Sequence, residues 1–267
     1  MSDRIGALLL GSLLSLPLAA SAYDVPRAAQ EPVIDGDAGD PAWQIAEWRP
    51  IDKPVFDPLP AADDFSGRYK VVWTPDYLFV LAEITDDVLI DTHADPLELY
   101  WEDDTFEIFV DEDASGGDHQ FSYNAFAYHI ALDNQVVDIA PFANDEQRRS
   151  GRNNVRTYPD HVLARWRRSG EAPNRVYWEA RIAVFSDGGS ASADATALSR
   201  VSLAPGKTLG FMVAYCDADA TDGRQHFVGD VEITPVDGDR NRGYIDAGVF
   251  GRITLIDNEK TERGGSR

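Results

Sequence analysis

The chain has 267 residues, of which 43% are hydrophobic and 10% aromatic, and its formal net charge is −22. This composition supports a packed core and excludes wholesale disorder. The negative charge disfavours nucleic acids and acidic membranes as partners, because their phosphates would be repelled. Neutral ligands and divalent cations stay open. The one cysteine, Cys216, allows no internal disulfide, and we expect it to pack as a small apolar side chain.

Residues 1–22 have the pattern of a signal peptide. Arg4 precedes an apolar stretch, Ile5 to Leu18, which is shorter than the roughly 20 residues that span a bilayer. Small residues at Ala20-Ser21-Ala22 suit cleavage by a signal peptidase. We therefore expect export, to the periplasm or the medium, with a mature chain that begins at Tyr23 and has no membrane span.

The segment Pro32 to Trp48 predicts a short helix. Asp40 can cap it, with Pro41 at its first position and Trp43, Ile45 and Ala46 pointing inward. Residues 50–67 are rich in Pro and Asp and predict a surface loop.

Short β-branched and aromatic runs separated by Gly, Pro and Asp turns fill most of the remaining chain. They predict an all-β antiparallel sandwich or barrel with one or two short helices. Residues 23–257 are expected to form one domain, followed by a polar tail, 258–267. Within the remaining chain, only Ser190 to Leu198 has a weakly helical pattern. The expected strands are Tyr69–Trp73, Leu78–Ile84, Thr105–Val110, Gln120–Leu132, Gln135–Ile139, His161–Trp166, Val176–Phe185, Leu209–Tyr215, Gln225–Val228 and Val249–Leu255.

The stretch Trp101 to Asp113, WEDDTFEIFVDED, is the densest feature. Its strand has a period of two, which places Glu107 on the face opposite Phe106, Ile108 and Val110. A carboxylate in that position is either a ligand contact or part of a solvated sheet face.

Acidic clusters suggest calcium, which takes six to eight oxygen ligands from flexible loops. One set lies at the two ends of the strand that contains Glu107, with Glu102, Asp103 and Asp104 before it and Asp111, Glu112, Asp113 and Asp118 after it, and another contains Asp217, Asp219 and Asp222. Neither has the spacing of an EF-hand, and an acidic chain also produces such clusters by chance.

Aromatic side chains can stack on the apolar face of a sugar ring, while amides and carboxylates bind its hydroxyls. Trp43, Trp73 and Trp178 lie in apolar runs and are expected in the core. Trp101, beside Tyr100 at the start of a strand, is expected to be partly exposed and is the tryptophan best placed to bind a ligand.

The blocks PVIDGDAGDPAW, RYKVVWTPDYLFVLAEITD, YWEDDTFEIFVDED and HQFSYNAF, followed by YWEARIAV, LGFMVAYCDAD and FGRITLI, resemble family 9 carbohydrate-binding modules in the same order. The resemblance covers about Pro32 to Ile256. It implies an immunoglobulin-like sandwich of the wider DOMON group, a saccharide ligand and, in many members, calcium.

The resemblance also implies a site. Trp101, with neighbouring Tyr100, matches the aromatic clamp of the family, and Glu107 and Asn124 match its polar contacts. Two positions depart from the pattern: Ser122 stands where the family has a sugar-binding arginine, and His226 with Phe227 stands where a second clamp tryptophan is expected.

Other functions stay open. A haem-binding electron-transfer domain of the DOMON type would need Met212 as an axial ligand, although a methionine within a strand usually packs in a core. A glycoside hydrolase or an accessory domain of one is the third possibility. No catalytic residue is assigned. The leading expectation is a binding protein that supports carbohydrate catabolism, with a separate glycoside hydrolase as a possible partner.

Overall fold

A computed structural model describes residues 22–56, 58–169, 175–187, 198–220 and 223–258. The expected signal peptide 1–22, the weakly helical stretch 190–198 and the polar tail 258–267 lie outside these residues, except for residues 22, 198 and 258. None of the described helices is long and apolar enough to cross a membrane.

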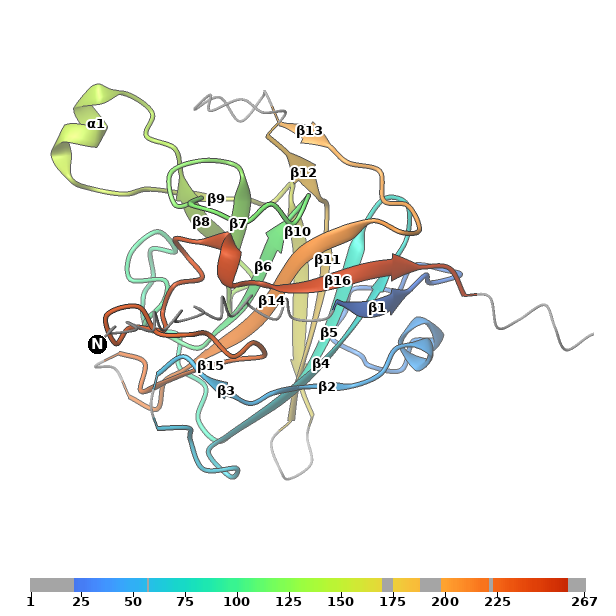
Figure 1. The fold of residues 1–267 in the computed structure, drawn as a ribbon. Coiled ribbons are helices and arrows are strands. Elements are labelled where there is room, and N and C mark those ends of the chain that lie inside the picture. The colour runs from blue at the N-terminus through green and yellow to red at the C-terminus, as the bar shows by residue number, and fades with distance from the viewer. Residues whose placement is uncertain (1–21, 57, 170–174, 188–197, 221–222, 259–267) are drawn as a thin grey trace, which may run out of the picture.

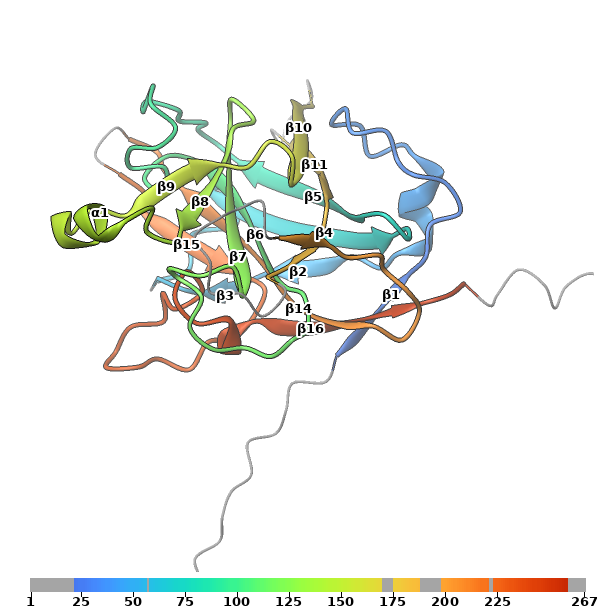
Figure 2. The same cartoon turned by 90° about the horizontal axis from the view of Figure 1, so that it is seen from above.

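Two β-sheets lie face to face and confirm the predicted all-β sandwich (Figures 1 and 2). The smaller sheet has the order β10 (Val162–Arg168), β11 (Arg175–Ile182), β5 (Leu78–Asp86), β4 (Phe65–Trp73) and β2 (Arg49–Ile51). The larger sheet has the order β1 (Tyr23–Pro26), β16 (Gly251–Ile256), β14 (Thr208–Asp217), β6 (Thr105–Asp111), β7 (Ala125–Ala131), β8 (Val136–Ala140) and β9 (Asn154–Thr157). Its remaining strands are β15 (His226–Gly229), which pairs with β14, and β3 (Lys53–Pro54), which pairs with β15.

Helical structure is sparse in the described residues. It comprises α1 (Asp145–Ser150) and the 3₁₀ helices η1 (Pro41–Ile45) and η3 (Ala247–Val249), while a small ribbon joins β12 (Phe185–Ser186) to β13 (Ser199–Arg200). One strand pair departs from the antiparallel prediction, because β1 runs parallel to β16. These two strands come from opposite ends of the chain, so no hairpin forces them to be antiparallel.

The main core lies between the two sheets. Phe106, Ile108 and Val110 of β6 point into it, whereas Phe109 lies in a second apolar cluster on the outer face of the larger sheet. The period-two prediction for β6 is therefore confirmed. Glu107 shares the outer face with Phe109, and this face carries the candidate site described below.

The first residues after β1 pack on the outer face of the smaller sheet. Glu179 of β11 is fully buried there and accepts hydrogen bonds from the backbone N–H groups of Asp35 and Gly36 and from the Trp43 indole. Trp43 is buried as predicted, but Ile45 is 41% exposed, so its predicted inward position is wrong. The short 3₁₀ turn explains the difference, because its side chains do not follow the spacing of an α-helix.

Several boundaries also differ from the sequence prediction. The strand expected from Gln120 begins only at Ala125, because residues 120–124 form a turn in which the Ser122 N–H bonds to the His119 carbonyl. The expected loop 50–67 contains β3, part of β2 and the start of β4. Asp40 does not cap η1, since its carboxylate accepts from the Val33 N–H instead.

Candidate functional site

A pocket of about 320 Å³ opens on the outer face of the larger sheet. Its floor comes from β6, β7 and β8, and its walls come from the loops around them. The lining residues combine aromatic rings, amides and charged groups: Tyr100, Trp101, Glu107, Phe109, Gln120, His129, Ile139, Asn153, Arg224, Phe227, Asn241 and Tyr244.

Two aromatic residues ahead of β6 form one wall. The rings of Tyr100 and Trp101 meet edge to face at 4.8 Å, and Tyr100 meets the His129 ring in the same way at 4.7 Å. The Trp101 indole N–H donates to the Glu102 carboxylate at 2.7 Å. Tyr100 is buried, whereas Trp101 is half-buried, so a ring surface of Trp101 is available to a ligand.

A buried network lies on the pocket floor. Glu107 of β6 is only 1% exposed and lies opposite His129 of β7 and Ala214 of β14 in the strand registers. Its Oε1 lies 3.2 Å from His129 Nε2 and accepts from the Cys216 thiol at 3.0 Å. The other ring nitrogen of His129, Nδ1, lies 2.9 Å from the Ala127 carbonyl oxygen.

Arg224 extends this network toward the ligand space. Its guanidinium packs over the rings of Phe56 and Phe227, at 4.7 and 4.6 Å from their centroids. One guanidinium nitrogen donates to Cys216 Sγ at 3.0 Å and lies 4.0 Å from the Glu107 carboxylate. Its backbone N–H donates to Glu102, the same carboxylate that holds the Trp101 indole.

These contacts set the charge state of the floor. Burial alone would raise the pKa of Glu107, but the charge of His129, the hydrogen bonds from His129 and Cys216 and the charge of Arg224 bring that pKa below its usual value. Burial alone would lower the pKa of His129, but Glu107 raises it above its usual value. The floor therefore places the Glu107 carboxylate beside His129 and the Arg224 guanidinium, and the two pKa shifts favour the charged forms of Glu107 and His129.

Amides and a phenol supply polar groups around this floor. Asn153 is exposed, and Gln120, Asn241 and Tyr244 are half-buried. Each amide offers both donors and an acceptor, which matches the mixed donor and acceptor character of hydroxyl groups. The pocket can therefore bind a neutral polyhydroxylated ligand with an apolar face against Trp101.

The residues expected from sequence divide into two groups. The structure brings Tyr100, Trp101 and Glu107 together in the pocket. Asn124 and His226 do not line it: the Asn124 amide donates to the Gly116 carbonyl, and His226 lies near Asp64 and the Pro58 carbonyl.

The structure also shows where the two positions that depart from the family pattern lie. Ser122 lies in the turn before β7 and does not line the pocket. An arginine nevertheless reaches the pocket, since Arg224 enters from the segment before β15. Tyr244 supplies a second half-buried aromatic side chain, while Phe227 is buried beneath Arg224.

A buried group of three carboxylates lies at one end of the sandwich. Asp86 ends β5, Asp104 precedes β6 and Asp217 ends β14, so the group joins the two sheets. Each residue offers a ligand atom within 4.8 Å of the others, and none is more than 1% exposed. Two further candidate groups adjoin it: Asp64 and His226 with Asp217, and Asp64 with Asp87 and Asp219.

Asp217 gives this group a ligand-binding character. Both of its carboxylate oxygens are buried without a hydrogen-bond partner among the described residues. Burial and the charge of Asp86 raise the pKa of Asp217 to about 8, and burial and Asp86 raise that of Asp104 to about 9. A hard cation with several oxygen ligands would satisfy these oxygens, so the residues present fit calcium.

The other predicted calcium ligands make bonds within their own loop. Asp111 accepts from the Gly116 N–H at 2.7 Å, Asp113 accepts from the Ser115 N–H and Asp118 accepts from the Gln120 N–H. None of the three belongs to a candidate cation group of the described residues.

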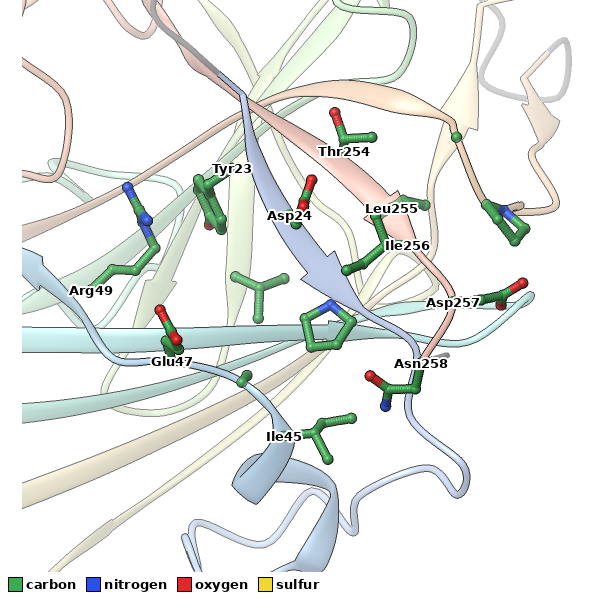
Figure 3. Close-up of a pocket in the computed structure, with 15 residues that line it drawn as sticks. Tyr23, Asp24, Ile45, Glu47, Arg49, Thr254, Leu255, Ile256, Asp257 and Asn258 are labelled. Atoms are coloured by element: carbon green, nitrogen blue, oxygen red, sulfur yellow. The ribbon is translucent and has the colours of Figure 1, made fainter. Parts of the chain in front are cut away.

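A larger groove of about 860 Å³ runs along β1 and β16 (Figure 3). Tyr23 and Arg49 lie at one end and Asn258 at the other. Two of its polar side chains are already engaged within the protein: the Tyr23 hydroxyl donates to Tyr69, and the Arg49 guanidinium lies 3.8 Å above the Tyr23 ring. The smaller pocket at Trp101 is therefore the better candidate site.

Met212, which the haem-binding hypothesis would need as an axial ligand, lies in the middle of β14 and is 1% exposed. It packs in the apolar cluster on the outer face with Phe109 and Phe250. This environment is that of an ordinary packing residue.

Comparisons with known proteins agree with the fold. Residues 34–258 match the model of the family described as "Carbohydrate family 9 binding domain-like". Two similar structures are family 9 modules from Caldicellulosiruptor kristjanssonii. The complex with cellotriose has 19% identity and a TM-score of 0.60, covering 92% of this chain and 100% of that one. The complex with glucose has 18% identity and a TM-score of 0.61, covering 90% and 100%.

A search of curated proteins gave no significant match. The family model nevertheless spans most of the chain, and it covers the pocket residues from Tyr100 to Tyr244 and the three buried carboxylates. The chain therefore belongs to the carbohydrate family 9 binding domain-like family.

Proposed function

We propose that this protein binds a saccharide in the pocket beside Trp101. The observation that carries the proposal is the combination of a half-buried tryptophan with three amide side chains around one cavity. The ring of Trp101 would stack on the apolar face of a sugar, and Gln120, Asn153 and Asn241 would bind its hydroxyls.

A glucose-based ligand is the first candidate, because the two similar structures contain glucose and cellotriose. The volume of about 320 Å³ lies at the lower end of the range of roughly 300–1,000 Å³ for small-molecule sites. This size suits a mono- or disaccharide unit better than a long chain enclosed along its length. The proposal is of a binding protein, with saccharide capture serving carbohydrate catabolism after export.

The buried network gives Glu107 a specific role. Because Glu107 is 1% exposed and already bonded to Cys216 and His129, it acts mainly by holding Arg224 and His129 in place. Arg224, together with the amides, would make the direct polar contacts.

Calcium is proposed as a bound cofactor. Asp86, Asp104 and Asp217 would hold it, with Asp219 and Asp64 close by. The ion would supply charge compensation for three buried carboxylates that otherwise repel one another.

Isothermal titration of the mature protein with glucose, cellobiose, cellotriose and xylotriose tests the function. We expect saturable binding that Trp101→Ala abolishes. Trp166→Phe is the matched control, because the Trp166 ring lies 5.9 Å from the Trp178 ring and does not line the pocket. The proposal would be wrong if no sugar bound, or if Trp101→Ala bound as tightly as the wild type.

A further inference from the structure

Two of the three buried carboxylates, Asp104 and Asp217, lie close along the chain to residues of the saccharide pocket or its floor. Asp104 follows Trp101 by three positions, in the segment that connects the pocket wall to β6. Asp217 directly follows Cys216, whose thiol contacts both Glu107 and Arg224 on the pocket floor. The segments that carry Asp104 and Asp217 are therefore the same segments that carry Trp101 and Cys216.

Hydrogen bonds join the same two segments across the sheet. The Ala218 N–H donates to Asp104 Oδ1 at 2.8 Å, so the end of β14 is tied to the start of β6. On the pocket side, Glu102 accepts from both the Trp101 indole and the Arg224 N–H. Two carboxylates of the segment before β6 therefore bond to the chain that follows β14: Asp104 bonds to Ala218, and Glu102 bonds to Arg224.

The chain after Asp217 is held in a similar way. The Gln225 N–H donates to the Asp217 carbonyl at 2.8 Å, and the Gln225 side chain accepts from the Asp219 N–H at 2.7 Å. Arg224 is therefore next to a residue that is bonded at both ends to the carboxylate-bearing segment. Arg224 lies over Phe56 and Phe227, and these bonds of Gln225 tie its neighbour to the segment that carries Asp217 and Asp219.

The three neighbouring carboxylates repel one another when they are ionised, and Asp217 has no hydrogen-bond donor among the described residues to hold it. A bound cation would draw Asp86, Asp104 and Asp217 together and fix the ends of β5, β6 and β14. Calcium suits this arrangement better than magnesium, because it accepts many carboxylate oxygens in a flexible geometry.

We propose that calcium bound by Asp86, Asp104 and Asp217 fixes Trp101 and Arg224 in the pocket, so that calcium binding and saccharide binding strengthen each other. This inference rests on the proposed function, since it concerns the same pocket. Linkage requires reciprocity: the factor by which calcium raises the saccharide affinity must equal the factor by which the saccharide raises the calcium affinity.

The test uses the mature chain stripped with EGTA and then titrated with CaCl₂. Hydrogen exchange reports on the peptides around Trp101 and around Arg224, and calorimetry gives the affinity for cellotriose with and without calcium. We expect calcium to slow exchange in both peptides and to raise the cellotriose affinity at least about fivefold. Cellotriose should raise the calcium affinity by the same factor.

Two variants test whether the effect of calcium comes from the group of Asp86, Asp104 and Asp217 and not from other acidic residues. Asp217→Asn should lose calcium binding and bind cellotriose only as weakly as the stripped wild type, whatever the calcium concentration. Asp113→Asn, an exposed acid outside the candidate groups, should behave as wild type. The comparison of stripped and loaded wild type does not depend on either variant folding.

The outcomes distinguish the inference from the proposed function. If no saccharide binds in either state, the proposed function fails, and calcium-dependent exchange at Trp101 and Arg224 alone decides whether the ion fixes these segments. If calcium does not bind, or binds without changing exchange and cellotriose affinity, the inference is overturned even where saccharide binding stands.

Discussion

Replacing Glu107 by Gln tests the buried network on the pocket floor. Glutamine keeps the volume of the side chain but removes the charge that faces His129 at 3.2 Å and Arg224 at 4.0 Å. At an effective dielectric constant of about 20, unit charges at these distances attract by about 5 and 4 kcal/mol. The variant regains part of this energy, because His129 can lose its proton and Arg224 can move. We therefore expect its free energy of unfolding to fall by about 3 kcal/mol, which is at the lower end of the values for breaking a buried ion pair.

The pH dependence of this loss identifies its cause. Because Glu107 raises the folded pKa of His129, the histidine contribution is fully present below the unfolded pKa of about 6.5 and disappears as the pH rises through the raised folded value. Because the pKa of Glu107 is lowered, its contribution disappears as the pH falls through that lowered value. Urea denaturation of both proteins should therefore show a larger difference at pH 6 than at pH 9. A difference below about 1 kcal/mol, or one equal at both pH values, would refute the network as drawn.

Further predictions concern a buried acid, a glycine and the pocket wall. Burial raises the pKa of Asp138 to about 7. As the pH rises from 5 to 7, the free energy of unfolding of the wild type should therefore fall by up to about 1.4 kcal/mol per pH unit relative to that of Asp138→Asn, and parallel curves of stability against pH would contradict this. Gly36 has φ +79° and a Cβ there would lie 2.7 Å from the Trp166 and Arg167 backbone, so Gly36→Ala should cost about 2 kcal/mol or more in thermal denaturation, and an unchanged melting temperature would contradict it. Trp101→Phe keeps a smaller ring for stacking and should retain more saccharide affinity than Trp101→Ala; equal affinities in calorimetry would argue against stacking.

The sequence was most informative where its pattern is periodic. In β6 the alternation placed Phe106 in the core and Glu107 on the outer face, and both positions are confirmed. The same alternation in β7, where Phe126 and Tyr128 face the core, would have identified His129 on the outer face beside Glu107. Strand ends were less predictable, since turns such as residues 120–124 depend on contacts with distant loops.

The pocket walls could not be found from local patterns. Asn153, Arg224 and Asn241 come from separate segments and meet only because the sheet order places them around β6 and β7. The carboxylate group shows the same limit. Composition identified the acidic stretches that contain Asp104 and Asp217, but it could not show that Asp86 joins them from β5 in the opposite sheet.

The central claim is that a saccharide binds against Trp101, and the indole N–H signals of the six tryptophans test it most directly. A two-dimensional ¹⁵N–¹H spectrum would be recorded during titration of the calcium-loaded mature protein with cellotriose. If the sugar stacks on Trp101, the signal of its indole N–H, which donates to Glu102, should shift until the site is saturated. The signals of the buried Trp43, Trp73 and Trp178 should change little. A titration that left Trp101 unchanged, or that shifted only a tryptophan outside the pocket, would contradict it.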